Sequence, residues 1–211
     1  VYSFAFIPEL HAQQRKLSPD ELPLGVTKLS LFRDAYERLS AAGYKTIGMD
    51  HFAVPEDELA RAQALGKLGR NFQGYTVRAA SDVIAFGVTA ISDVQGLFVQ
   101  NTREPSVYRE ALSRGELATA RGICLTEDDV RRRAVIEQIM CNFALRLDAP
   151  EREYFAAELR DLEAMVDEGF VRMDPDRVTL TDSGRVFVRN IAMVFDAYHR
   201  AGKQSGFSRT V

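Results

Sequence analysis

The sequence is organised around Gly69-Arg70-Asn71-Phe72-Gln73-Gly74-Tyr75-Thr76, which lies between two strand-like runs, Lys45–Met49 and Val83–Ile91. Glycine permits positive φ angles and close backbone approach, so a loop of this kind can lay its main chain against a ligand. The aromatic, carboxamide and hydroxyl side chains between the glycines are poorly suited to a packed core. Such a loop could bind a ligand, whereas its spacing alone favours an ordinary solvated surface loop.

Length and composition are those of a globular chain. The 211 residues suit one large domain or two small ones, and 46% hydrophobic content is ordinary. A formal net charge of −3 argues against a general polyanion binder. No apolar run approaches the roughly 20 residues of a membrane-spanning helix, so no membrane partner is expected. The widely separated Cys124 and Cys141 predict a reduced, cytoplasmic protein with structural cysteines.

The first hundred residues predict alternating strands and helices. Val1–Ile7 is β-branched and aromatic, Gly25–Ala42 carries apolar residues at helical spacing, and Lys45–Met49 again suits a strand. Glu56–Leu65 suits another helix, and Val83–Val88 a third strand. We expect the strands to lie parallel, in an α/β sheet or barrel. Because the chain opens inside an apparent strand without an initiator Met, we also expect it to be a piece of something longer.

In parallel sheets, ligands bind beyond the carboxyl ends of the strands. This rule would bring Ala5–Pro8, Asp50–Phe52 and Thr89–Ser92 to one face. His51 follows Asp50 directly, but neighbours within a strand point in opposite directions, so the two do not automatically form a dyad. A hydrogen-bonded loop histidine is the alternative.

The second half of the chain is predominantly helical. Thr126 precedes three acidic residues, which predicts a capped helix start. The predicted order is helix, helix, two-stranded hairpin and helix, which is typical of a winged-helix domain at about residues 126–199. We place the domain boundary between residues 1–104 and 105–211. The predicted elements are Pro105–Arg114, Thr126 to about Phe143, Glu153–Asp167, Phe170–Met173 with Val178–Leu180, and Asp182–Tyr198.

Charge argues against nucleic-acid binding by this winged-helix pattern. Between Thr126 and His199 there are sixteen acidic residues, ten arginines and no lysine, whereas a DNA-reading face must be basic. The cluster Arg131-Arg132-Arg133 spreads over several helix faces and is expected to pair with nearby acids. We therefore predict a structural lid or docking module with no nucleic-acid partner.

Several blocks of sequence, spread over essentially the whole chain, form one recognisable set. They are Ile47–Ala53, Arg70–Thr76, Gly87–Ser92, Gln100-Asn101, Arg121-Gly122, Cys141–Phe143, Val188–Met193 and Phe207–Arg209. Together these blocks resemble those of oxygen-independent coproporphyrinogen III oxidases (dehydrogenases), radical S-adenosylmethionine (SAM) enzymes of haem biosynthesis. The related haem-chaperone branch usually has a different block where this chain has Asn71–Tyr75, so the dehydrogenase is favoured.

The resemblance implies the carboxyl-terminal portion of an incomplete radical SAM β/α barrel, followed by the helical domain. The ligands of the 4Fe-4S cluster would lie upstream, so this piece alone should be inactive. The implied reaction is oxidative decarboxylation of two propionates of coproporphyrinogen III to vinyls, giving protoporphyrinogen IX. The alternative is a non-catalytic tetrapyrrole-binding or haem-chaperone-like module. The sequence identifies neither the electron donor nor the acceptor.

The resemblance also implies roles for individual residues. Ala5 and Ile91 match positions that contact the first SAM, and Phe72 and Gln73 match positions lining a second SAM. The cations Arg15, Lys16 and Arg70 are candidates for binding substrate propionates. A parent of this kind should be a monomer. A barrel cut open leaves a strand edge unpaired, so we expect this piece to self-associate or to be locally disordered near Val1–Ile7.

Overall fold

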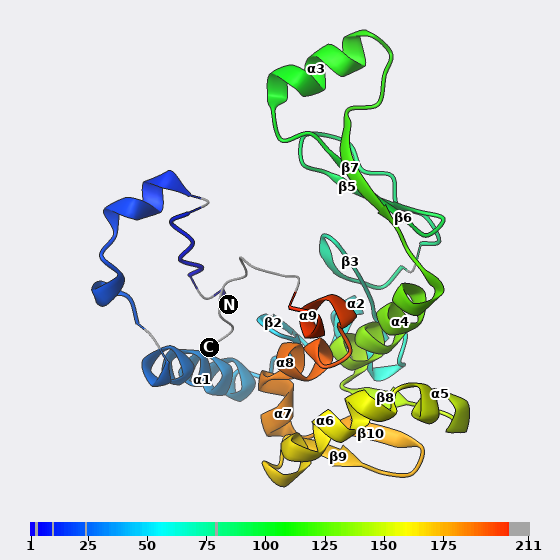
Figure 1. The fold of residues 1–211 in the computed structure, drawn as a ribbon. Coiled ribbons are helices and arrows are strands. Elements are labelled where there is room, and N and C mark those ends of the chain that lie inside the picture. The colour runs from blue at the N-terminus through cyan, green and yellow to red at the C-terminus, as the bar shows by residue number, and fades with distance from the viewer. Residues whose placement is uncertain (3, 10, 24, 79, 203–211) are drawn as a thin grey trace. The chain divides into compact units, whose positions relative to one another are not determined.

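The computed structural model describes residues 1–2, 4–9, 11–23, 25–78 and 80–202 and is drawn in Figure 1. Contacts divide the chain into two compact units, one of Val1–Leu68 with Val135–Val211 and the other of Gly69–Ala134. This division by contacts differs from the predicted boundary after residue 104. The division into a barrel portion at residues 1–104 and a helical domain at 105–211 stays a prediction. In the part of the chain described, no helix has both the length and the apolar character to cross a membrane.

Val1–Ile7 does not form the predicted strand in its described residues. The side chain of Gln14 supplies hydrogen bonds to the backbone of this segment instead. Its Oε1 accepts from the Ile7 amide at 2.6 Å, and its Nε2 donates to the Ala5 carbonyl at 3.0 Å. The prediction was wrong because a strand needs a paired neighbour, and β propensity alone does not supply one. The short helix η1 (Ala12–Lys16) carries Gln14.

The remaining elements of this part are η2 (Pro19–Glu21), α1 (Val26–Ala41), β1 (Lys45–Gly48), β2 (His51–Ala53) and α2 (Glu58–Ala64). Both predicted helices are present. Asp57 caps α2 by accepting from the Leu59 amide at 2.8 Å. The strands β1 and β2 are antiparallel, with Lys45 opposite Ala53, as is every other strand pair among the described residues, so the predicted parallel sheet is absent from them. The mixture of helix and sheet was correctly predicted.

The second part of this unit contains the predicted helices and hairpin, with changes in detail. The sheet has the order β8–β10–β9, so a short third strand, β8, joins the predicted hairpin. The helices expected at 153–167 and 182–198 are divided, because Phe155 and Phe187 leave the helical conformation. The elements are α4 (Glu127–Asn142), β8 (Ala144–Arg146), α5 (Ala149–Tyr154), α6 (Ala156–Asp167), β9 (Val171–Met173), β10 (Arg177–Leu180), α7 (Asp182–Val186), α8 (Val188–Met193) and α9 (Ala197–Arg200).

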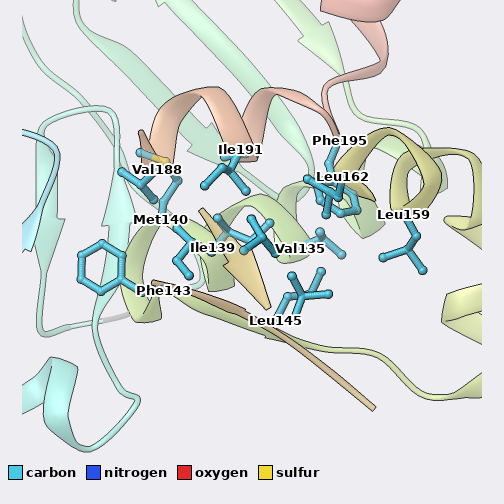
Figure 2. Packing of buried hydrophobic residues seen from close by; sticks show 14 of the residues in the cluster. Val135, Ile139, Met140, Phe143, Leu145, Leu159, Leu162, Val188, Ile191 and Phe195 are labelled. Atoms are coloured by element: carbon cyan, nitrogen blue, oxygen red, sulfur yellow. The ribbon is translucent and has the colours of Figure 1, made fainter. Parts of the chain in front are cut away.

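The hydrophobic core of the first unit lies among these elements (Figure 2). Helices α4, α6 and α8 contribute Ile139, Leu162 and Ile191, each with 0% exposure. The break at Phe155 also brings an aromatic ring into the core, where it packs edge-on against Phe195 with 5.6 Å between ring centroids. The local loss of helical geometry is thus offset by the burial of a large side chain.

Gln63 links three elements of the first unit. From α2, its Nε2 donates to the carbonyl of Ile47 in β1 at 2.5 Å and to that of Cys141 in α4 at 2.9 Å. Two segments 78 residues apart are thus joined by one carboxamide. Both acceptors belong to nearly inaccessible residues, so neither carbonyl readily finds water as a substitute.

We expect Gln63→Met to destabilise the protein by about 1–3 kcal/mol, because it removes the two hydrogen bonds to buried carbonyls while it keeps the side-chain volume. Chemical denaturation followed by circular dichroism measures this change. Arg61→Ala, an exposed substitution on the same helix, is the control and should have little effect. Equal stability of the two variants would contradict a role for the carboxamide.

The second unit contains two antiparallel sheets. A hairpin joins β3 (Gly69–Asn71) to β4 (Gly74–Thr76), and the larger sheet has the order β5–β6–β7. Its strands are β5 (Ile91–Val94), β6 (Leu97–Asn101) and β7 (Thr119–Cys124), with α3 (Pro105–Ser113) between β6 and β7 in sequence and in Figure 1. Strand β7 was not among the predicted elements.

The strand predicted at Val83–Val88 was wrong, because only Val83 forms an isolated bridge, with Asp93. Gly87 and Thr89 have φ angles of 106° and 62°, which an extended strand cannot accommodate. The strand begins only after this turn, at Ile91.

Candidate cofactor-binding site

Phe72 and Gln73 occupy the tip of the β3–β4 hairpin. Asn71 pairs with Gly74 across the hairpin, and its Oδ1 accepts from the Gln73 amide at 2.8 Å. An asparagine side chain that bonds the amide two residues later stabilises a tight turn. Gly74 has a φ of 131°, which favours glycine. The turn leaves the Phe72 side chain 54% exposed and Gln73 exposed beside it.

Phe72 packs against the β5–β6–β7 sheet. Its ring meets that of Phe98 edge-on, with 4.9 Å between centroids and 85° between planes. Ile91 lies opposite Gln100 and Asp93 opposite Phe98, so these four residues share one face of the sheet. Phe72 and Ile91, two of the predicted site residues, are thus brought to the same face within the second unit.

The turn before Ile91 is held by the strand beside it. Asn101 donates from Nδ2 to the Gly87 carbonyl at 2.9 Å, and Gln100 donates from Nε2 to the Thr89 carbonyl at 3.0 Å. Arg121 in β7 donates from Nε to Oε1 of Gln100 at 2.7 Å, which orients that carboxamide. Together these bonds hold Thr89 in a positive-φ conformation that is costly for a β-branched residue. The turn before Ile91 is therefore held by side-chain hydrogen bonds from strand β6.

Arg133, from the first turns of α4, reaches the same face. Its Nη2 donates to Oδ2 of Asp93, whose residue is only 8% exposed, and its guanidinium lies 5.1 Å from the centroid of Phe98. The prediction that the arginine cluster pairs with nearby acids holds for Arg132, which bonds Asp128 four residues away at 2.9 Å. Arg133 instead binds a carboxylate 40 residues distant.

Of the other predicted residues, Ala5, Arg15 and His51 belong to the first unit and Arg70 to strand β3 of the second. Ala5 is exposed in the first unit, where its carbonyl is bonded by Gln14. His51 does contact Asp50, with 2.8 Å between Nδ1 and Oδ1, because Asp50 lies in a turn where strand alternation does not apply. Arg15 donates to the Pro8 carbonyl at 3.0 Å, and the Arg70 guanidinium lies 5.6 Å from the centre of the Tyr75 ring.

The described residues do not fit a metal cluster. No group of three or more His, Cys, Asp or Glu side chains among them is arranged to hold a metal ion. Cys141 is buried and Cys124 exposed, and neither forms a disulfide. The prediction of structural cysteines therefore suits Cys141 better than Cys124.

Comparison with known proteins gives consistent matches over the chain. The family model for the HemN C-terminal domain matches residues 125–187. The oxygen-independent coproporphyrinogen III oxidase of Pseudomonas aeruginosa is 42% identical over 100% of this chain and 47% of its own length. That of Thermostichus vulcanus is 39% identical over 100% of this chain and 67% of its own length. This chain spans about half the length of most of the curated relatives that it matches.

A solved structure also matches, described as "Coproporphyrinogen III oxidase (HemN) from Escherichia coli is a Radical SAM enzyme". It has a TM-score of 0.86 and 40% sequence identity, over 92% of this chain and 46% of that chain. The fold is therefore that of part of a radical SAM enzyme. Within that class, the chain belongs to the oxygen-independent coproporphyrinogen III oxidase family.

Sequence reasoning missed Asp93 and Phe98, and with them the partners of Arg133. Phe98 lies in the short apolar run Leu97–Val99, which would suit any strand, and nothing local connects Asp93 to Arg133. A carboxylate within an apolar strand is the one signal that could have raised the question of a buried partner, because such groups are almost always paired.

Proposed function

We propose that this chain belongs to an enzyme that oxidatively decarboxylates two propionates of coproporphyrinogen III to vinyls, giving protoporphyrinogen IX. The observation that carries the proposal is the alignment of the entire chain with enzymes of that name at about 40% identity. Residues 1–104 would contribute to an incomplete radical SAM barrel and residues 105–211 would form its helical domain. The protein would act in the cytoplasm, as a monomer when whole.

Two SAM molecules would lie against this chain. Ala5 and Ile91 would contact the first, and Phe72 and Gln73 would line the site of the second. When bound, SAM would supply the 5′-deoxyadenosyl radical that removes hydrogen from the propionate, with the electron for its cleavage coming from the reduced cluster and the electron left after loss of carbon dioxide passing to an acceptor. The residues present fit such a ligand, because a half-exposed phenyl ring can stack on an adenine and an exposed carboxamide can bond its edge.

The contribution of this chain is to bind, orient and exclude water, since the hard chemistry belongs to the cofactor. The Phe72 ring, which is held by Phe98, would cover an apolar part of the ligand. Ile91 would offer an apolar surface next to the turn at residues 87–89. The cluster would be held by residues outside the described part of this chain, which has no suitable ligand group. The cations Arg15, Lys16 and Arg70 remain candidates for the substrate carboxylates.

The test uses the whole protein, reconstituted anaerobically with iron and sulfide. Phe72→Ala is expected to weaken binding of the second SAM equivalent by about tenfold, as expected for an aromatic that lines a binding site. Gln73→Ala should weaken it less. Equilibrium dialysis with labelled SAM measures the number of bound equivalents, and chromatography of the product measures vinyl formation.

Phe86→Ala is the matched control, because Phe86 lies in the same unit and is 87% exposed. It should leave both SAM binding and vinyl formation unchanged. A whole protein that binds a tetrapyrrole but forms no vinyl groups under these conditions would contradict the enzyme and favour the chaperone-like alternative.

A further inference from the structure

The Phe72 side chain has one identified aromatic neighbour and is otherwise half exposed. A ring at the tip of a two-residue turn adopts several rotamers unless something holds it. The edge-on contact with Phe98 supplies that constraint. The orientation of Phe72 therefore depends on what holds Phe98.

Phe98 is held in turn by Arg133 and Asp93. Because Asp93 and Phe98 are directly opposite in an antiparallel pair, their side chains emerge side by side on one face of the sheet. One guanidinium can therefore bind the carboxylate and cover the ring at the same time. We call these three residues the anchor cluster.

Asp93 is itself fixed by its backbone. Its amide donates to the Val83 carbonyl at 2.9 Å, and its carbonyl accepts from the Val83 amide at 2.7 Å. The Asp93 side chain is 12% exposed and that of Arg133 is 41% exposed. A buried carboxylate bonded to a guanidinium is costly to leave alone, so the pair is held together firmly. In the anchor cluster, strand β5 therefore holds the carboxylate of Asp93, and helix α4 carries the guanidinium of Arg133.

We propose that Arg133, held by Asp93, is a positioning residue for Phe72: it fixes the Phe98 ring and so presets the shape of the site for the second SAM. This inference rests on the proposed function, since that assigns Phe72 to the second SAM. If the Phe72 ring already has its binding orientation, little conformational entropy is lost when SAM binds. Preorganisation of this kind strengthens binding. Arg133 touches neither ligand nor reacting atoms in this scheme.

The test uses the whole protein with para-fluorophenylalanine incorporated at position 72 and observed by fluorine NMR. Three changes loosen the anchor cluster: Phe98→Leu, Arg133→Gln, and the pair Asp93→Asn with Arg133→Gln. The pair leaves no buried charge, so it reports on positioning even if Arg133→Gln alone fails to fold. In each folded variant, the fluorine resonance should move towards that of the free amino acid and its line should narrow.

SAM is the probe for binding, measured by equilibrium dialysis as before. Loosening the cluster should weaken the second equivalent about 2- to 10-fold, the range of an aromatic contact, and should weaken the first equivalent less. Arg133→Lys keeps the cation and should restore part of the loss, whereas a merely structural role would change both equivalents and the melting temperature in parallel. Arg109→Met removes an exposed arginine from α3 in the same unit and should change nothing.

The two proposals fail in different ways. A wild-type protein that binds a single SAM equivalent contradicts the assignment of Phe72 and therefore the proposed second site as well as this inference. A wild type that binds two, together with an unchanged fluorine resonance and unchanged affinities in Phe98→Leu and the double variant, contradicts the positioning role alone.

Discussion

Gly184→Ala is expected to lower the free energy of unfolding by about 3 kcal/mol or more, since overpacking against rigid atoms has effects of this order. A Cβ on Gly184 would lie 2.0 Å from the carbonyl oxygen of Phe170 and 2.9 Å from its carbonyl carbon. Both are backbone atoms, which cannot rotate away as the end of a side chain can. The clash must therefore move β9 or α7.

Helix propensity favours the opposite result. Gly184 lies within α7 at an ordinary helical φ, where alanine is more favourable than glycine by about 1 kcal/mol. The clash should prevail, because Thr181 ties the two segments together: its Oγ1 accepts from the Gly184 amide at 3.1 Å and donates to the Gly169 carbonyl at 2.7 Å. Neither segment can withdraw without breaking this cap.

Chemical denaturation followed by circular dichroism measures the change. Ser183→Ala is the matched control, since Ser183 is exposed on the same helix, and it should be neutral or slightly stabilising. If Gly184→Ala proves as stable as this control, then the close approach of α7 to Phe170 is wrong.

Phe155→Ala is expected to lower the free energy of unfolding by about 3–5 kcal/mol, the range found for large aromatic side chains in packed cores. The side chain has 0% exposure and meets the rings of Phe195 and Tyr154 at 5.6 Å and 4.9 Å between centroids. Its removal leaves a cavity between the α5–α6 junction and the chain after α8. The surroundings can close this space only in part.

The same denaturation experiment tests this expectation with two comparisons. Phe155→Leu should be less destabilising, because it retains most of the apolar volume. Leu31→Ala removes an apolar side chain that is 57% exposed on α1, and should have an effect within about 0.5 kcal/mol. A similar effect of Leu31→Ala and Phe155→Ala would mean that the core is not organised around this ring.

Helix positions could be read from the sequence because their signals are local. Apolar spacing predicted α1, the acidic start after Thr126 predicted α4, and the β9–β10 hairpin was expected at Phe170–Met173 with Val178–Leu180. Each signal lies within a few residues of the structure that it specifies. The loop at residues 69–76 and four candidate site residues, Ala5, Phe72, Gln73 and Ile91, were also singled out from sequence blocks.

Strand pairing was the weaker part of the prediction. Val1–Ile7 has the composition of a strand, but its hydrogen bonds go to the Gln14 side chain, and the strand expected at Val83–Val88 begins only at Ile91. β propensity describes a fit to a neighbouring strand rather than an intrinsic conformation. Without knowledge of that neighbour, composition alone cannot place the strand.

The sequence by itself determined the approximate helix positions, the β9–β10 hairpin and the family, and it predicted Ala5, Phe72, Gln73 and Ile91 as site residues. Only the tertiary structure brought the Phe72 ring onto Phe98 and joined Arg133 to Asp93 across 40 residues. The physical reason is that contact between distant residues depends on strand register and on where a helix begins in space. These are properties of the assembled sheet and helix, and no local stretch of sequence contains them.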